Sequence, residues 1–394
     1  MIRSGFVFPH YAEAWLGGVS YLRNLLGALA ASPECGVQPV LLTQSARPVG
    51  FERVEVVRSF ALRVRHQLLA RGILKRTGWD PLDRILAHHR LDVLSHSGVL
   101  GPRARVPALA WIPDLQHRAL PEFFSQEERD ARDAAVEVAL REAARVIVSS
   151  EAARQDMERF FPGFAGKLRV LRFIDRTLAA AQAPPREALE ARYGFSGRYF
   201  LLPNQYWAHK NHQRVLEALS LLQREGKEVL VLATGSADDH RNPGHFDRLM
   251  RLRAELGLEA RYRVLGVVPY ADLAGLLRNA AALINPSLFE GWSTSVEEAK
   301  SLGKRVLLSD IAVHREQAPA RGVYFDTAHA DRLAEAIWSA WQSTDLGEEE
   351  ASARRAAEAL PLRQREFAET YAALVREVVT VAAPSRVAAS ANSG

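Results

Sequence analysis

Ile284-Asn-Pro-Ser-Leu-Phe-Glu290-Gly-Trp-Ser-Thr-Ser-Val-Glu-Glu298-Ala-Lys-Ser-Leu-Gly303 is the stretch that decides the fold. It reads as a short buried strand, a polar loop from Asn285 and a helix that ends at Gly303. Thr294 and Glu297 have the spacing of a capping box at the helix start. A helix start carries free N–H groups and the positive end of the helix dipole, so it suits an anion such as a diphosphate. We therefore expect an anion site where this strand ends.

Two carboxylates lie near that anion site. Glu290 precedes the helix, and Glu298 falls in its first turns. Carboxylates on either side of a bound anion can accept hydrogen bonds from two sets of hydroxyls of one ligand, as a sugar nucleotide requires. The alternative is that Glu297 and Glu298 only favour the start of the helix.

Short apolar runs alternate with amphipathic stretches along most of the chain, which is typical of parallel α/β sheets. The runs expected to be strands in the first part are residues 5–9, 38–43, 92–96, 107–112 and 145–149. Those in the second part are residues 199–203, 229–234, 262–265, 281–285 and 306–309. An alanine- and proline-rich break at residues 175–193 separates the two series. The sequence therefore predicts an α/β protein with two doubly wound domains.

The predicted domain boundaries follow from that break. The first domain covers residues 1–178 and the second covers residues 179–361. A helical pattern at residues 362–379 lies in a C-terminal segment, residues 362–382, that we expect to cross back to the first domain. Residues 383–394 are small and polar, so we expect a disordered tail.

Composition limits the cellular setting. The 394 residues include one cysteine and have a formal net charge of +5. A single cysteine excludes an intrachain disulfide framework, and no apolar run is long enough for a membrane span, so we expect a cytoplasmic protein. Residues 53–76 mix arginines with apolar side chains and predict either peripheral contact with an anionic membrane or a solvated helical face. The sequence contains no compact array of basic and aromatic residues, so it does not predict nucleic-acid binding.

The opening stretch resembles glycosyltransferase family 4, which is marked by a Phe-Glu-Gly opening and a second glutamate eight positions after the first. Glu290 and Glu298 have that spacing, and residues 308–316 extend the resemblance. It implies a GT-B fold, in which two Rossmann-like domains face each other across a cleft. It further implies that Glu298 binds ribose hydroxyls, while the donor sugar and phosphates meet Glu290, Gly291, Trp292, Ser293, Thr294 and Ser295.

A second match covers residues 204–212. Lys210 stands where the family has a lysine that binds phosphate, and its charge could neutralise a diphosphate leaving group. Asn204 and Gln205 occupy the place of the family's arginine, so Lys210 would carry more of that charge beside them. The alternative is a solvated lysine at a helix start.

Other candidate contacts follow strands at the edge where open sheets bind ligands. The resemblance implies that Val268 flanks the base, with Gly235 and Ser236 nearby, although structural turns explain these glycines equally well. Gly17 and Gly18 precede a helical pattern and resemble the family's glycine loop, which lets backbone amides approach phosphate.

Asp114 and His117 follow the strand at residues 107–112. Many relatives have a histidine directly before this aspartate, where this chain has Pro113. His117 could take over contact with the donor sugar or acceptor, and a capping or core histidine is the alternative.

The resemblance implies a retaining, metal-independent hexosyltransferase with no cofactor beyond its nucleotide-sugar donor. No Asp-x-Asp motif is present, since Asp238 and Asp239 are adjacent. GDP-mannose is preferred over UDP- and dTDP-sugars, and the expected acceptor is a glycan or lipid-linked glycan of bacterial surface polysaccharide, such as O-antigen or capsule. The alternatives are a GT-B-like nucleotide-sugar epimerase, a glycan phosphorylase and a non-catalytic glycan-binding scaffold.

Overall fold

The chain forms two compact units, which are described separately. The structure is a computed structural model that describes residues 1–8, 16–44, 48–63, 65, 80–101, 104–343 and 345–391, without the side chains of residues 16 and 382–391. Unit 1 comprises residues 1–115, 127–173 and 363–394, and unit 2 comprises residues 116–126 and 174–362. The main boundary thus follows residue 173, whereas the sequence placed it after residue 178.

Unit 1 contains a parallel sheet with seven strands among the described residues, in the order β3-β2-β1-β4-β5-β6-β7. The strands are β1 (Ile2–Val7), β2 (Val37–Thr43), β3 (Glu55–Arg58), β4 (Val93–Ser95), β5 (Ala108–Trp111), β6 (Arg145–Val148) and β7 (Leu168–Val170). The helices include α1 (Leu16–Ala31), α4 (Pro81–His88), α6 (Gln126–Glu142) and α7 (Glu151–Phe160). The strand order reverses direction between β1 and β4, as in a doubly wound fold.

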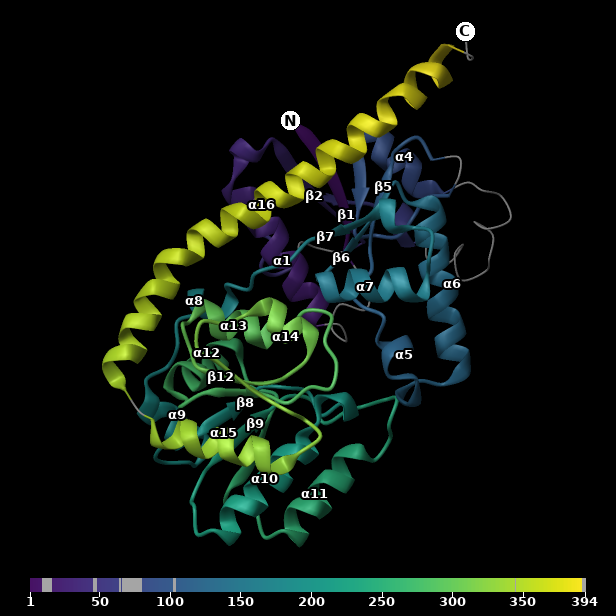
Figure 1. Cartoon of the computed structure of the whole chain (residues 1–394). Helices are drawn as coiled ribbons and strands as arrows, with labels where there is room; N and C mark the ends of the chain where they lie inside the picture. The colour runs from purple at the N-terminus through teal and green to yellow at the C-terminus, as the bar shows by residue number, and fades with distance from the viewer. Residues whose placement is uncertain are drawn as a thin grey trace. The chain divides into compact units, whose positions relative to one another are not determined.

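Unit 2 contains a second parallel sheet, in the order β10-β9-β8-β11-β12-β13 (Figure 1). The strands are β8 (Phe200–Leu202), β9 (Val231–Thr234), β10 (Tyr262–Gly266), β11 (Leu283–Asn285), β12 (Val306–Ser309) and β13 (Gly322–Phe325). The helices are α5 (Gln116–Ala119), α8 (Thr177–Ala180), α9 (Arg186–Tyr193), α10 (His212–Arg224), α11 (His245–Glu255), α12 (Tyr270–Asn279), α13 (Thr294–Ser301), α14 (Ala312–Gln317) and α15 (Ala330–Gln342).

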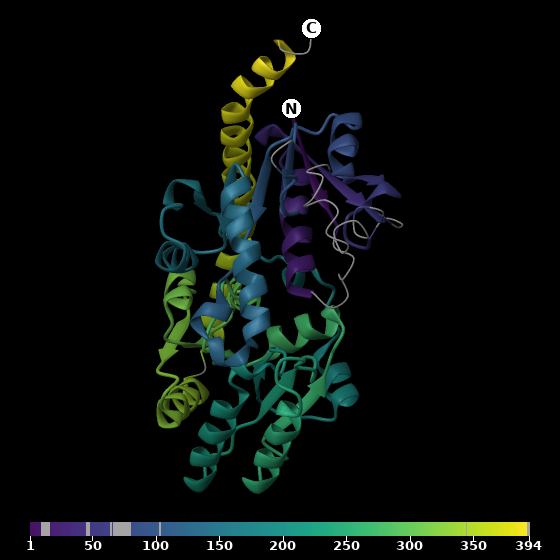
Figure 2. The same ribbon diagram turned by 90° about the vertical axis from the view of Figure 1, so that its right-hand side faces the viewer.

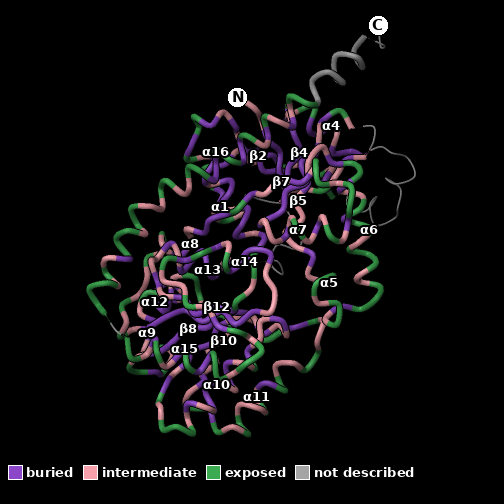
Figure 3. The backbone as a smooth tube through the Cα atoms, in the orientation of Figure 1, coloured by how far each residue is buried: buried purple, intermediate pink, exposed green. Residues whose placement is uncertain are grey.

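Both faces of the unit 2 sheet are buried, because its central strand β8 is apolar at every position rather than at alternate ones. In β8, Phe200 and Leu202 pack into one apolar cluster, while Leu201 packs into the cluster on the opposite face. Helices therefore cover both faces, which Figure 2 shows from the side, and the strands appear as buried segments in Figure 3.

The predicted α/β class with two Rossmann-like units is confirmed. The ten expected strands correspond to β1, β2, β4, β5, β6, β8, β9, β10, β11 and β12. The sequence did not predict β3, β7 or β13, each of which lies at an edge of its sheet.

One long helix, α16 (Leu346–Ala391), follows unit 2 and continues into unit 1. It begins earlier than the helix predicted at residues 362–379, and Pro361 lies inside it. The residues before Pro361 are mostly alanine, glutamate and arginine, which favour a helix strongly enough for it to continue through the proline. The helix also includes residues 383–391, where a disordered tail was expected. Within unit 1, Tyr371 Oη on α16 lies 2.6 Å from Ser4 Oγ on β1.

The arginine-rich segment at residues 53–76 is only partly described. Residues 55–58 form β3 and pair with β2, so this part is a strand of the sheet and not a helical face. Residues 64 and 66–76 lie outside the described residues, and the proposed membrane contact stays a prediction. No helix in the described parts of the chain combines the length and apolarity needed to span a membrane.

Candidate functional site

Lys210 and Glu290 come from the two strands that flank the switch point of the unit 2 sheet. Successive strands run outward from β8 through β9 to β10, and then from β11 through β12 to β13. Lys210 ends a 3-10 turn (Ala208–Lys210) that follows β8, and Glu290 lies in the loop that follows β11. Open α/β sheets bind ligands outside the carboxyl ends of their strands at such a point.

Backbone contacts hold these two loops together. Leu288 donates its backbone N–H to the carbonyl of His209 at 2.8 Å. Asn211, with a left-handed φ of 55°, donates its side-chain amide to the carbonyl of Pro286 at 3.2 Å. The loop after β8 therefore fixes the loop that carries Glu290.

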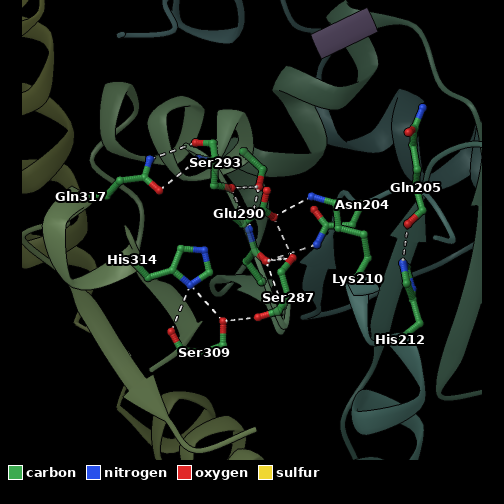
Figure 4. A network of polar contacts seen from close by, with 12 residues as sticks. Asn204, Gln205, Lys210, His212, Ser287, Glu290, Ser293, Ser309, His314 and Gln317 are labelled. Atoms are coloured by element: carbon green, nitrogen blue, oxygen red, sulfur yellow. Dashed lines mark hydrogen bonds and ion pairs between the residues drawn. The ribbon is translucent and has the colours of Figure 1, made fainter. Parts of the chain in front are cut away.

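Lys210 and Glu290 form a direct ion pair in this fixed frame (Figure 4). Lys210 Nζ lies 2.6 Å from Glu290 Oε1, and Ser287 Oγ lies 2.7 Å from the same oxygen. The Glu290 side chain is 9% exposed and that of Lys210 is 20% exposed. Burial alone would raise the pKa of Glu290, but the Lys210 ammonium prevails and lowers that pKa to about 2. The pair is therefore charged at neutral pH.

Buried asparagine and serine side chains shape the start of the Glu290 loop. Asn285 donates its amide to Ser293 Oγ at 2.8 Å and to Ser295 Oγ at 3.2 Å. Its carbonyl oxygen accepts from Ser287 Oγ at 2.7 Å and from the Asn204 amide at 3.4 Å. Asn204 is thus a neighbour of the loop through a neutral contact, where an arginine would have added charge.

Three imidazoles surround this frame, and burial lowers the pKa of each, so all three are neutral at physiological pH. His212 lies 3.1 Å from the carbonyl of Gln205 through Nε2 and 2.7 Å from Tyr262 Oη through Nδ1, which fixes the loop after β8. His314 Nδ1 donates to the Ser309 carbonyl at 3.0 Å, while its buried Nε2 has no hydrogen-bond partner. His209 is 6% exposed and adjoins Lys210.

The start of α13 differs from the predicted capping box. Ser293 is the N-cap, and it makes no side-chain capping bond, so the assignment of Thr294 as cap partner of Glu297 is wrong. The Glu297 carboxylate instead accepts from Lys300 Nζ at 3.0 Å and from Gln317 Nε2 at 3.1 Å. These partners draw the Glu297 side chain inward, away from the helix end.

Gln317 on α14 holds this helix start in place. Its amide oxygen accepts the Ser293 N–H at 3.2 Å, and its amide nitrogen donates to the Ser293 carbonyl at 3.0 Å. A single side chain thus satisfies both backbone groups of a buried residue. The first N–H groups of a helix have no intrahelical partner, so α13 presents donors beside the Glu290 loop. Gly291 and Trp292 are buried in that loop.

Glu298 lies on α13, and 6% of it is exposed. Among the described residues, no hydrogen bond or ion pair engages its carboxyl group. Burial and the nearby carboxylate of Asp175 raise the pKa of Glu298 well above its ordinary value. Asp175 itself is held by the backbone N–H of Thr177 at 2.7 Å. Glu298 therefore holds its proton to a higher pH than an exposed glutamate does.

The residues expected near the base lie in two neighbouring loops. Gly235 has a φ of +131°, and a Cβ atom there would lie 2.6 Å from the carbonyl oxygen of Asn204. The backbone conformation and the close packing therefore both require glycine at this position. Ser236 accepts the backbone N–H of Tyr206 at 3.0 Å through its carbonyl. Val268 is half-buried against the apolar core.

Asp238 and Asp239 differ in role. Asp239 is buried and accepts the backbone N–H groups of Ala208 at 3.0 Å and Arg241 at 3.1 Å. It therefore fixes the turn that leads to Lys210. Among the described residues, no group of histidine, cysteine, aspartate and glutamate side chains could hold a metal ion.

Asp114 and His117 belong to different units. Asp114 follows β5 in unit 1, while His117 lies on α5 in the segment that groups with unit 2. His117 is 2% exposed, and its ring meets Phe124 edge-on at 6.2 Å. Arg241 stacks over the rings of Phe124 and Trp207 at 4.5 and 4.1 Å, which fastens the α5 segment to the loop after β8.

Gly17 and Gly18 lie in the first turn of α1, and not in a loop before it. A Cβ atom at Gly17 would meet nothing within 4 Å, so crowding does not require glycine there. The prediction that these glycines contact phosphate stays open, as do the roles assigned to Asp114 and His117.

The residues that sequence reasoning missed are mainly those that position others. His212 and Gln317 make their contacts with residues of other segments, whereas His314 contacts Ser309 five residues earlier. His212 and His314 did fall inside the two matched stretches, and that signal could have identified them. Gln317 lies just beyond the second stretch.

The chain is similar to known proteins over part of its sequence and in its fold. Residues 193–359 match the family model described as glycosyl transferases group 1. Among curated proteins, no sequence matches the chain significantly. Solved structures resemble the chain over nearly its whole length, at low identity.

Three of these structures illustrate the likeness. Anabaena HepE, solved in complex with UDP and glucose, is 18% identical with a TM-score of 0.68, covering 96% of this chain and 100% of HepE. Sucrose-phosphate synthase from Thermosynechococcus elongatus is 18% identical with a TM-score of 0.65, covering 98% and 100%. WaaG, a glycosyltransferase involved in lipopolysaccharide biosynthesis, is 15% identical with a TM-score of 0.55, covering 97% and 99%.

The structural likeness assigns the GT-B fold to the whole chain, and the matched residues 193–359 contain both Lys210 and Glu290. Residues 193–359 are thus similar to the group 1 glycosyl transferases, and the whole chain has the GT-B fold.

Proposed function

We propose that the protein transfers a hexosyl group from a nucleotide-diphosphate sugar to a glycan or lipid-linked glycan, with retention of anomeric configuration. The single observation that carries this proposal is the Lys210–Glu290 pair at the switch point, beside the start of α13. The site combines a cation, backbone donors and carboxyl groups, which are the groups that a diphosphate and a sugar need.

Each group has a role in this reaction. The Lys210 ammonium, paired with Glu290 in the ligand-free protein, would also interact with the diphosphate, where negative charge grows as the glycosidic bond breaks. Glu290 and the loop from Gly291 to Ser295 would contact the sugar and phosphates, and Glu298 would accept hydrogen bonds from the ribose hydroxyls. With retention, the acceptor hydroxyl attacks from the face that the nucleotide leaves, and a donor phosphate oxygen takes its proton.

The pathway belongs to the same proposal. The likeness to WaaG supports an acceptor from bacterial surface polysaccharide, and the likeness to HepE, solved with UDP and glucose, supports testing UDP-sugars as donors along with GDP-mannose. Because Lys210 and the helix start would neutralise the diphosphate, we expect transfer to persist when EDTA removes divalent metals. The protein would act in the cytoplasm, with any membrane contact peripheral.

A donor panel tests the proposal. GDP-mannose, UDP-glucose and dTDP-glucose are incubated with and without a lipid extract that contains glycan acceptors, and release of nucleoside diphosphate is measured. We expect fast release only with acceptor, and product NMR should show the donor's anomeric configuration. Conversion of donor alone would indicate an epimerase, and a requirement for inorganic phosphate would indicate a phosphorylase.

A matched pair of variants tests the site. Glu290→Gln should lower the transfer rate at least about 100-fold, because contacts to developing charge and to the sugar carry such effects. Glu228→Gln, whose side chain is 85% exposed, makes the same chemical change away from the site and should keep the wild-type rate. Equal rates for the two variants would remove Glu290 from the mechanism.

A further inference from the structure

A hollow of about 350 Å³ lies in unit 2 beside β13, the edge strand of its sheet. Its walls come from β13, α15 and the start of α16, and they include Arg305, Arg321, Ser343 and Glu348. Arg305 and Arg321 directly precede β12 and β13, whereas the Glu290 loop follows the carboxyl end of β11. In a parallel sheet these are opposite edges, so the hollow is separate from the proposed donor site.

Positive charge gathers at this edge of the sheet. Val306 pairs with Gly322 across β12 and β13, which sets the preceding residues, Arg305 and Arg321, side by side. Like charges on neighbouring strands destabilise a sheet. Lys304 adds another cation. Burial is the largest cause that lowers the pKa of Lys304 and of Arg305, and nearby arginines also lower both.

Few carboxylates balance this charge. Glu349 Oε2 lies 3.8 Å from Lys304 Nζ, and Glu349 Oε1 lies 4.0 Å from Arg321 Nη2. One carboxylate thus serves two cations at the outer limit of an ion pair. Glu348 lines the hollow, but it binds Arg355 at 2.6 Å on the exposed surface.

The other basic side chains at this edge donate hydrogen bonds to backbone carbonyls of the protein. Arg305 Nη1 donates to the carbonyls of Ala340 at 3.2 Å and Ser343 at 3.0 Å, and Arg198 also binds the carbonyls that end α15. Cations are favourable at this negative end of a helix dipole. Lys304 donates to the Arg278 carbonyl at 3.1 Å.

Arg321 is the exception. Its side chain is 10% exposed, and neither Nη1 nor Nη2 has a hydrogen-bond partner. A buried guanidinium that makes no hydrogen bond through Nη1 or Nη2 is costly, and a planar fork of donors fits the oxygens of a phosphate or carboxylate. The cation excess favours a doubly charged oxyanion.

We propose that this hollow binds a phosphoryl group, with Arg321 as the principal charged contact and Arg305 and Ser343 beside it. The ligand is inorganic phosphate or a small phosphorylated metabolite, and the volume accommodates either. This site does not depend on the proposed glycosyl transfer, since no residue is shared with the donor site.

Thermal unfolding with inorganic phosphate tests the proposal. The full-length chain carries Lys210→Met in every sample, so that phosphate is not measured at the donor site, and sodium chloride keeps ionic strength constant. We expect a saturable rise in Tm, because a ligand that binds the folded state stabilises it in proportion to its occupancy. Arg321→Gln should abolish the saturable part.

Arg224→Gln is the matched control, since it removes one arginine charge from the exposed end of α10. It should keep the saturable rise. In phosphate-free buffer, Arg321→Gln should have a Tm equal to or above that of the parent, because it removes a buried charge whose Nη1 and Nη2 make no hydrogen bond. An equal saturable rise in both variants, or none in the parent, would overturn the proposal.

A second arm distinguishes the two ligand sources. Glucose 6-phosphate and glucose replace inorganic phosphate at the same concentrations in the same samples. A larger saturable shift with glucose 6-phosphate than with phosphate, and none with glucose, assigns the site to a phosphorylated metabolite. Equal shifts with phosphate and glucose 6-phosphate assign it to the phosphoryl group alone, and a shift with glucose that survives Arg321→Gln contradicts both.

Discussion

Lys210 controls the charge state of Glu290. Their contact lowers the pKa of Glu290 from an ordinary 4.5 to about 2, so the stabilisation is present above about pH 4.5 and is lost as pH falls towards 2. In Lys210→Met, burial would instead raise that pKa. The variant should lose about 3 kcal/mol in the free energy of unfolding at neutral pH, and the loss should shrink on acidification through pH 4.5.

Urea unfolding across a pH series measures this effect. Lys227→Met is the control, because Lys227 pairs with Glu225, whose side chain is 58% exposed and so does not become a buried charge when the lysine is removed. A difference between Lys210→Met and wild type that stays constant with pH would show that Glu290 is not the group involved.

Glu298 leads to a different pH dependence. In the proposed site Glu298 would accept hydrogen bonds from ribose hydroxyls as a carboxylate. Because burial and Asp175 raise the pKa of Glu298, nucleotide binding would release a proton at any pH below that pKa. Affinity for the cognate nucleoside diphosphate should therefore rise with pH, by up to about tenfold per unit below that pKa.

Calorimetry in buffers of different ionisation enthalpy measures the proton release directly. Glu298→Gln should bind more weakly and show no release, while Asp175→Asn should shift the pH dependence to lower pH. Binding by wild-type protein that is independent of both pH and buffer would contradict the role given to Glu298.

At the residue scale, the sequence identified Lys210 and Glu290 as candidate site residues but not the residues that hold the site in place. Lys210 and Glu290 were found because each lies in a stretch with a known pattern, and the structure brings the two together. Their partners were not found, because Gln317 acts on Ser293 from 24 residues away and nothing in its local sequence encodes that contact. The capping box failed for the same reason, since Glu297 has better partners inside the fold than at the helix end.

The short helix α13 depends on a neighbour for its position. Gln317→Leu keeps the side-chain volume but leaves the buried N–H and carbonyl of Ser293 without partners, which costs about 1–3 kcal/mol. We expect a lower Tm and weaker binding of the nucleoside diphosphate, because the donor groups of α13 lose their alignment.

Gln213→Leu is the control, since Gln213 bonds Glu217 on the exposed face of α10. Thermal unfolding and calorimetric titration of both variants distinguish the two positions. Wild-type binding by Gln317→Leu would mean that the loop after β11 keeps α13 in place without its help.

At the element scale, every interior strand in the described part of the chain was predicted, but of the four edge strands only β10 was. Interior strands carry an apolar run because helices cover both of their faces. The missed edge strands β3 and β7 contain charged residues, as in Glu55-Val-Val-Arg58, because one side of an edge strand meets no partner. β13 was missed although its four residues, Gly322–Phe325, carry no charge.

At the scale of the whole molecule, Pro361 is the weak point of α16. A proline cannot donate a hydrogen bond to the carbonyl four residues earlier, here that of Ala357, and costs up to about 3 kcal/mol inside a helix. The helix leaves unit 2 and enters unit 1 directly after it. Pro361→Ala should raise Tm and slow amide exchange in the surrounding turns.

Hydrogen exchange read by mass spectrometry measures that change. Glu358→Ala, an exposed substitution in the same turn, leaves the backbone bonds unaltered and should change exchange little. Unchanged exchange around residue 361 in Pro361→Ala would show that the helix already tolerates the proline at no cost.

The end of α16 also sets the order in which this protein can be completed during synthesis. A ribosome releases the chain from its amino end, so the Tyr371 hydroxyl that meets Ser4 emerges only after residues 174–362 of unit 2. Unit 1 therefore stays unfinished until after every residue of unit 2 has been made. In most multidomain chains the first domain folds first, whereas here the first unit waits for residues that follow the second. A premature stop codon before residue 363 would thus damage the unit farthest from it in the gene.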